Sequence, residues 1–105
     1  MSGVYLGNCV KEGVLSVTLS PAAVAPNTSA EQTFTVNGLQ TGDYVYVTKP
    51  TQQNGLAIVN ARVTAANTLG IAFGNLTATS ISPTASETYL VHLLRKDRTV
   101  TDANL

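Results

Sequence analysis

The sequence is poor in charge. Lys, Arg, Asp and Glu make up 11% of its 105 residues, in six basic and six acidic side chains, whereas soluble domains usually contain about 25%. The sequence has no dense cluster of Lys and Arg, so we expect no nucleic acid as the main partner. Such a low content of charged residues favours a surface that is largely covered by a partner protein, although a small secreted β-domain has a similar composition.

Long apolar runs and cysteine pairs are also missing. No apolar stretch approaches the roughly 20 residues that cross a bilayer, and the first residues lack the basic-then-apolar pattern of a signal peptide. Cys9 is the only cysteine, so no intrachain disulfide forms and packing must hold the fold together. We therefore expect no membrane association, no export signal and folding in a reducing, intracellular environment.

Residues suited to catalysis or metal binding are few. His92, the only histidine, lies in an apolar alternating stretch, which favours a packed or interface histidine over a general base. Cys9 has no second cysteine near it and is interpreted as a small apolar side chain. The acidic residues are spread singly, and no glycine-rich phosphate loop precedes a helix. The sequence therefore predicts no enzyme, no cofactor and no metal site.

The alternation of apolar and polar residues predicts strands. No stretch repeats apolar residues with a helical period, whereas six stretches alternate with period two. Pro, Gly and Asn separate them, as in antiparallel all-β domains. We predict an antiparallel β-sandwich or jelly-roll-like barrel with strands at 14–19, 31–37 and 43–49, two within 54–75, and 87–95.

The segment from Asn54 to Asn75 is the expected centre of the fold. A turn at Ala66-Asn67 divides it into two alternating runs, as in a β-hairpin. The alternation predicts that one side of each run faces the core, namely Ala57, Val59, Ala61 and Val63 in the first run and Leu69, Ile71 and Phe73 in the second.

Three parts of the chain are distinguished by pattern: an N-terminal arm (1–13), the β-domain (14–95) and a polar tail (96–105). The arm carries Val4, Tyr5 and Leu6, which are costly to leave in water, so we expect the arm to dock on its own domain or on a neighbour. Residues 87–95 are apolar on both sides, which indicates a central strand or one that a partner covers.

Outward-facing residues supply the other interface candidates. Tyr44, Tyr46 and Arg62 are expected on strand faces opposite the valines and alanines, and Tyr and Arg are enriched at interface hot spots. Such residues also cover the sheets of ordinary monomers. The predicted partner interface comprises Val4, Tyr5, Leu6, Tyr44, Tyr46 and Arg62.

A longer pattern runs from Leu15 to Arg95. It includes Pro26-Asn27-Thr28, AEQTFTV at 30–36, Gly38-Leu39, Gly42-Asp43, Lys49-Pro50, Gly55-Leu56, Asn60-Ala61-Arg62 and ETYL at 87–90. In its residue types and their spacing this stretch resembles small β-rich proteins encoded among the virion genes of tailed bacteriophages.

The resemblance implies a non-enzymatic virion component, most like a capsid decoration (cement) protein. Such a protein would sit on the outer capsid surface after assembly in the bacterial cytoplasm, and would bind the major capsid protein and itself, typically as a trimer. A tail or fibre adaptor or receptor-binding domain is the first alternative. A carbohydrate-binding module is another, although the chain has no Trp for sugar stacking.

Overall fold

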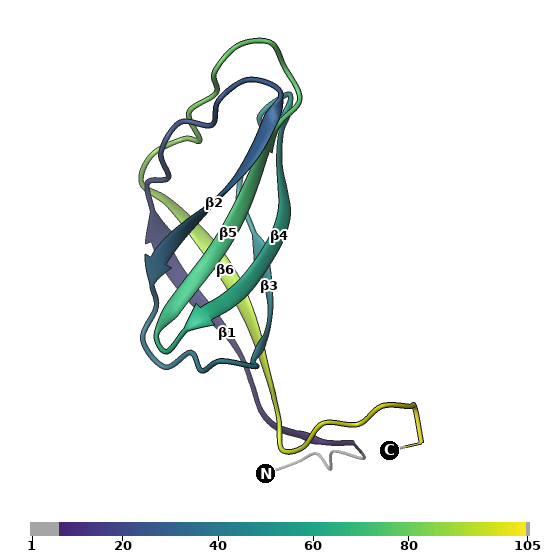
Figure 1. Ribbon diagram of the computed structural model, residues 1–105. Coiled ribbons are helices and arrows are strands. Elements are labelled where there is room, and N and C mark those ends of the chain that lie inside the picture. Colours follow the sequence, from purple (N-terminus) through teal and green to yellow (C-terminus); the bar gives the residue numbers. More distant parts are fainter. Residues whose placement is uncertain (1–6, 105) are drawn as a thin grey trace.

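Two three-stranded antiparallel sheets packed face to face form the protein, as Figure 1 shows in a computed structural model that describes residues 7–104. The first sheet has the order β1-β6-β3 and the second β2-β5-β4. The strands are β1 (Cys9–Leu19), β2 (Thr28–Thr35), β3 (Tyr44–Thr48), β4 (Leu56–Ala65), β5 (Thr68–Asn75) and β6 (Glu87–Lys96). Residues 7–104 contain no helix. The predicted all-β sandwich is confirmed.

Most connections cross from one sheet to the other, and only β4 and β5 form a direct hairpin within 7–104. Its turn uses Asn67 at a φ of 59°, a left-handed conformation that Asn tolerates better than most residues. The Asn67 side chain also accepts a hydrogen bond of 2.8 Å from the Gly38 amide. The predicted hairpin turn therefore also holds the loop between β2 and β3.

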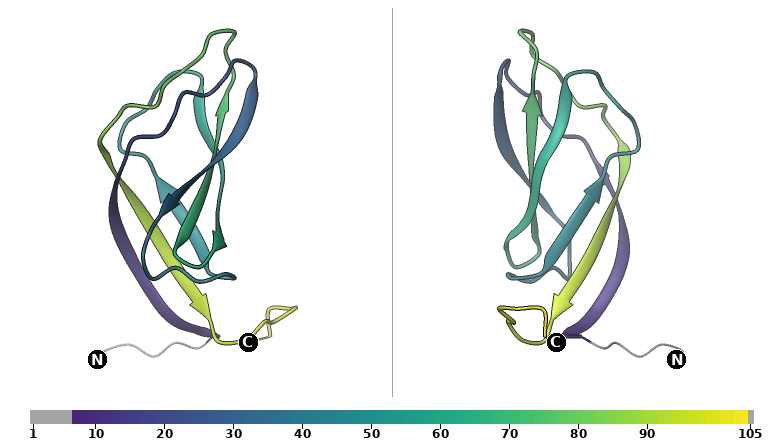
Figure 2. Two further views of the ribbon diagram at one scale, coloured as in Figure 1. Left: turned by 60° about the vertical axis from the view of Figure 1, so that its left-hand side comes forward. Right: turned by 90° about the vertical axis from the view of Figure 1, so that its right-hand side faces the viewer.

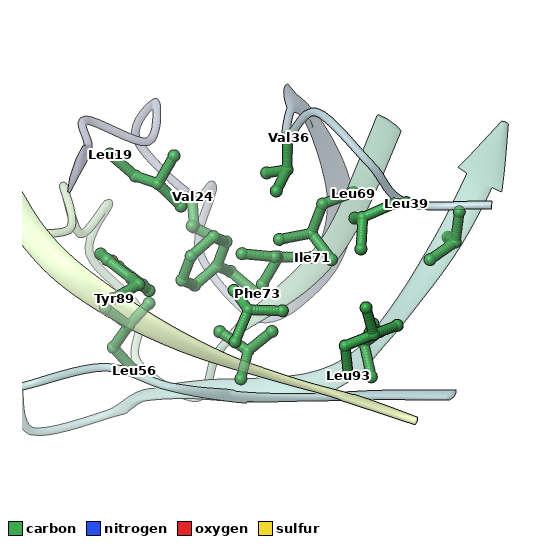
Figure 3. Close-up of a cluster of buried hydrophobic side chains, with 14 residues drawn as sticks. Leu19, Val24, Val36, Leu39, Leu56, Leu69, Ile71, Phe73, Tyr89 and Leu93 are labelled. Atoms are coloured by element: carbon green, nitrogen blue, oxygen red, sulfur yellow. The ribbon is translucent and has the colours of Figure 1, made fainter. Parts of the chain in front are cut away.

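The central strands β5 and β6 supply the middle of the core. Leu69, Ile71 and Phe73 of β5 are fully buried, as are Tyr89 and Val91 of β6. Figure 3 shows how the core side chains fill the space between the two sheets. The second run of the predicted hairpin therefore faces the core as expected, and it packs against the central strand of the opposite sheet.

The first run of the hairpin departs from the prediction at Ala57 and Val59. Val59 is 58% exposed, and Ala57 is exposed as well. The pairing of β4 with β5 shifts between Ile58 and Asn60, so Val59 is an extra residue. Such a β-bulge exchanges the two sides of a strand. The residues that face the core are consequently Leu56 and Ile58 before the bulge and Ala61 and Val63 after it.

Strand β1 begins earlier than its sequence pattern indicated. It starts at Cys9, which pairs with Lys96 of β6, so residues 9–13 are strand rather than arm. Asn8 continues this contact, because its carbonyl accepts a hydrogen bond of 2.7 Å from the Asp97 amide. The arm residues Val4, Tyr5 and Leu6 lie outside the described residues.

The loop between β5 and β6 is anchored by Asn75. This side chain is 1% exposed, and its Nδ2 donates hydrogen bonds to the carbonyl oxygens of Val24 (3.1 Å) and Thr79 (2.8 Å). Its Oδ1 accepts one from the Thr77 amide at 2.9 Å. Val24 also forms a β-bridge with Ile81. One buried amide therefore joins two loops at the same end of the sandwich.

Candidate functional site

The edge strands β3 and β4 border a groove on one side of the sandwich. In the described chain β3 pairs only with β6 and β4 only with β5, so one edge of each strand is free. Figure 2 (right) looks onto these two strands, which belong to different sheets. The β3–β4 groove is lined by residues 43–47 and 58–62 and has a volume of about 480 Å³. A second hollow of about 400 Å³ continues it toward Lys49 and Leu56.

Tyr44 and Tyr46 form one rim of the β3–β4 groove. Tyr44 is 57% exposed and Tyr46 is 61% exposed. Val45, between the two tyrosines, and Val47, directly after them, are buried. The predicted outward orientation of both tyrosines is confirmed. Because β3 is the edge of its sheet, the two rings stand on the border between the groove and the outer face of the first sheet.

Arg62 lines the same groove from β4. Its Nε and Nη2 donate to the two carboxylate oxygens of Glu31 on β2, at 2.8 and 2.9 Å. This bidentate hydrogen bond lowers the pKa of Glu31, more than its partial desolvation raises it. The Arg62 side chain is nevertheless 60% exposed, so its orientation is restrained while much of its surface remains open to a partner.

A glycine makes the Arg62–Glu31 pair possible. The two residues belong to the outer strands of the second sheet, and their ion pair crosses β5 at Gly70. A Cβ atom at position 70 would lie 2.7 Å from the Glu31 carboxylate and 2.7 Å from the Thr64 methyl group, which is closer than van der Waals contact. Gly70 therefore provides the space in which the two long side chains meet.

An ion pair holds the start of β3 in place. Arg95 of β6 donates from Nε and Nη2 to the two oxygens of Asp43, both at 2.9 Å. The Asp43 side chain is 2% exposed and also accepts a hydrogen bond from the Gln40 amide. The hydrogen bond from Arg95 is the main cause that lowers the pKa of Asp43. The buried, ion-paired Asp43 therefore fixes the backbone just before Tyr44, the first residue of the tyrosine rim.

A second ion pair lies at the other end of β3. Lys49 Nζ is 2.9 Å from Glu87 Oε1, and the Thr51 hydroxyl donates to Glu87 Oε2 at 2.6 Å. The hydrogen bond from Thr51 is the largest cause that lowers the pKa of Glu87, and the contact with Lys49 lowers it further. Strand β3, which forms one wall of the groove, is therefore held to β6 by an ion pair at each end. This indicates that the wall is ordered before a partner binds.

His92 and Cys9 lie away from the groove. His92 Nε2 is 2.7 Å from Glu12 Oε2 on the neighbouring strand β1, in a cross-strand contact on the outer face of the first sheet. Cys9 is a half-buried free thiol at the start of β1. Within residues 7–104 no three His, Cys, Asp or Glu side chains cluster as a metal site would require, and no helix is long and apolar enough to cross a bilayer.

The structure brings together three of the predicted interface residues, Tyr44, Tyr46 and Arg62, around one groove. Sequence reasoning missed Val59, which lines the groove from the bulge. It had placed Val59 in the core, because regular alternation contains no sign of a bulge. Comparisons of the chain with protein-family models, with curated proteins and with solved structures find no significant match.

Proposed function

We propose that this protein is a structural virion component of a tailed bacteriophage that decorates and stabilises the capsid by binding the major capsid protein, as a homotrimer. The observation that carries the proposal is the convergence of Tyr44, Tyr46 and Arg62, from different sheets, on the β3–β4 groove. The pattern from Leu15 to Arg95 that resembles phage virion proteins supports the same function. The low charge content also agrees with it.

The groove suits the capture of a protein segment. Its rims carry two exposed tyrosines and an oriented arginine, the residue types enriched in hot spots. The free edges of β3 and β4 add backbone donors and acceptors that an extended segment can use. A surface that is already ordered loses less conformational entropy when it binds than a mobile one.

Stabilisation of a capsid follows from mass action. A ligand that binds only the assembled shell shifts the equilibrium toward that shell, by about 2.7 kcal/mol per site when free ligand is at 100 times its Kd. Many equivalent sites on one shell multiply this effect. No catalytic step is involved, and the protein acts through the free energy of binding alone.

The test uses purified shells that lack this protein, with binding measured by co-sedimentation and shell stability by thermal melting. Arg62→Ala should weaken binding about tenfold or more, because an oriented hot-spot side chain is removed. The matched control is Thr35→Ala on β2, an exposed position on the outer face of the same sheet, which should bind as the wild type does. Unchanged shell binding with a lowered melting temperature of the free protein would make Arg62 a structural residue, and absence of binding by the wild type would refute the decoration function.

Two alternatives make different predictions in the same system. A tail or fibre adaptor would be present in a small multiple of three or six copies per particle, whereas a decoration protein would be present in hundreds. A carbohydrate-binding module is favoured by the two tyrosines beside Asn60 in the groove, because sugars stack on exposed aromatic rings. Binding to a glycan array that is lost in Tyr44→Ala and Tyr46→Ala would support that module instead.

A further inference from the structure

The edge strands of the sandwich differ in how well they are protected against pairing with a further strand. In the described chain these edges are β1 and β3 of the first sheet and β2 and β4 of the second. Proteins usually protect edges with charges, bulges or prolines, because unpaired backbone groups are a template for another strand. Strand β3 has none of these features, since its sequence is YVYVT and its pairing with β6 is regular. It is limited only in length, to five residues.

The other three edge strands carry such protection. Strand β1 has the charged residues Lys11 and Glu12 and a bulge that follows Cys9. Strand β2 carries Glu31, and β4 carries Arg62 and two irregularities in its pairing. A bulge bends a strand and disrupts its ladder locally. Strand β3 is therefore the edge most suited to accept a new neighbour.

The hydrogen-bond pattern shows which backbone groups of β3 are directed toward its free edge. The Asp97 amide donates to the Asn8 carbonyl at 2.7 Å, so the backbone of residue 97 is directed toward β1. Successive residues of an antiparallel central strand bond alternately to one neighbour and to the other. The even-numbered residues of β6 therefore bond to β3. Their partners on β3 are Tyr44, Tyr46 and Thr48. The N–H and C=O groups of Val45 and Val47 consequently point to the free edge.

A strand added to β3 would meet an apolar surface on its inner side. Its residues opposite Val45 and Val47 would point inward with them, because side chains directly opposite in a sheet lie on the same face. There they would meet Ile58 and Ala61 of β4, which line the same groove and pack against the core. The residues between them would lie beside the exposed tyrosine rings. The added segment therefore needs an apolar residue at every second position.

The charges around the groove favour an uncharged segment. Asp43 and Arg62 are the charged residues that line it. Each already forms a bidentate ion pair, Asp43 with Arg95 and Arg62 with Glu31. The lysine that lines the adjoining hollow is ion-paired as well. A charge on an incoming segment would lose water without gaining an unpaired opposite charge, which is costly.

We infer that the β3–β4 groove binds an extended, uncharged segment of the major capsid protein, which joins the first sheet as a fourth strand through the backbone of Val45 and Val47. The inference rests on the proposed function and specifies how the capsid protein is recognised. Backbone hydrogen bonds supply affinity in such strand addition, and the alternate side chains supply specificity. Five extended residues span about 17 Å, which matches the length of β3. A homotrimer would present three equivalent sites of this kind.

Hydrogen exchange tests the pairing directly. The full-length protein is placed in D2O, free or bound to purified shells that lack it, and is then released and read at single residues by fragmentation mass spectrometry. The amides of Val45 and Val47 should exchange about tenfold more slowly or less in the bound protein, because each gains a hydrogen-bond acceptor. The amides of Val14 and Ser16, which by the same alternation face the free edge of β1, are the internal control and should exchange alike in both states.

The outcomes separate the inference from the proposed function. Unchanged exchange at Val45 and Val47 in protein that stays bound to shells would overturn strand addition and leave the decoration function intact. Equal slowing at Val14 and Ser16 would also overturn it, because the effect would not be specific to β3. Absence of wild-type binding would refute the decoration function, and the inference with it.

Proline substitution supplies the second measurement. Val47→Pro removes an outward N–H and places the proline ring where the added strand would lie, whereas the bonds between β3 and β6 remain. It should weaken co-sedimentation with shells about tenfold or more. Val14→Pro makes the same change at the free edge of β1, outside the groove, and should bind as the wild type does. Far-UV circular dichroism checks that both variants fold. Wild-type binding by a folded Val47→Pro would overturn the inference, and if that variant does not fold, the hydrogen exchange of the wild type decides.

Discussion

The bulge at Val59 makes a quantitative prediction, because Val59 and Val63 would share one face in a regular strand. Val59 is 58% exposed and Val63 is 8% exposed. A Val→Ala change removes the equivalent of two methylene groups, each worth about 0.8 kcal/mol when buried. Val63→Ala should therefore lower the free energy of unfolding by about 2 kcal/mol, including a cavity contribution. Val59→Ala, with less than half of that surface buried, should cost about 0.7 kcal/mol or less.

Urea unfolding followed by far-UV circular dichroism measures both variants. Analysis of both with the same slope m converts each midpoint into a free energy. Val14→Ala, at a position that is 64% exposed, is the control and should resemble Val59→Ala. Equal losses for Val59→Ala and Val63→Ala would refute the bulge and restore the regular alternation of β4.

Asn75→Ala should lower the free energy of unfolding by about 2–3 kcal/mol, because it removes two hydrogen bonds that the buried amide donates and the acceptor of the Thr77 amide; urea unfolding checks this, and a wild-type midpoint would show that the two loops hold without the amide. Acid should also destabilise the fold. The pKa of Asp43 is lowered by Arg95, so this contribution to stability is complete above the unfolded pKa of about 4 and is lost as pH falls through the lower folded value. Melting temperatures from about pH 5 to pH 2 should fall less steeply in Asp43→Asn than in the wild type, and parallel curves would exclude Asp43 as a source of the acid sensitivity.

The candidate site shows how far sequence patterns reach. Period-two alternation is local, so it correctly assigned opposite sides of β3 to Tyr46 and Val47. It could not show that Arg62, on another sheet, borders the same groove, because that depends on which strands become edges. Nor did it indicate that Arg62 pairs with Glu31 across Gly70, since the two partners lie 31 positions apart in the chain.

The sequence by itself determined the all-β class, the hairpin turn at Asn67 and the burial of Leu69, Ile71 and Phe73, because side-chain alternation and turn conformations depend on neighbouring residues. Only the tertiary structure decided the strand order, the start of β1 at Cys9 and the exposure of Val59. These features depend on pairing between distant strands, where one extra residue in β4 exchanges its inner and outer sides. The β3–β4 groove exists for the same reason, because it arises only where β3 and β4 are edge strands of the two different sheets.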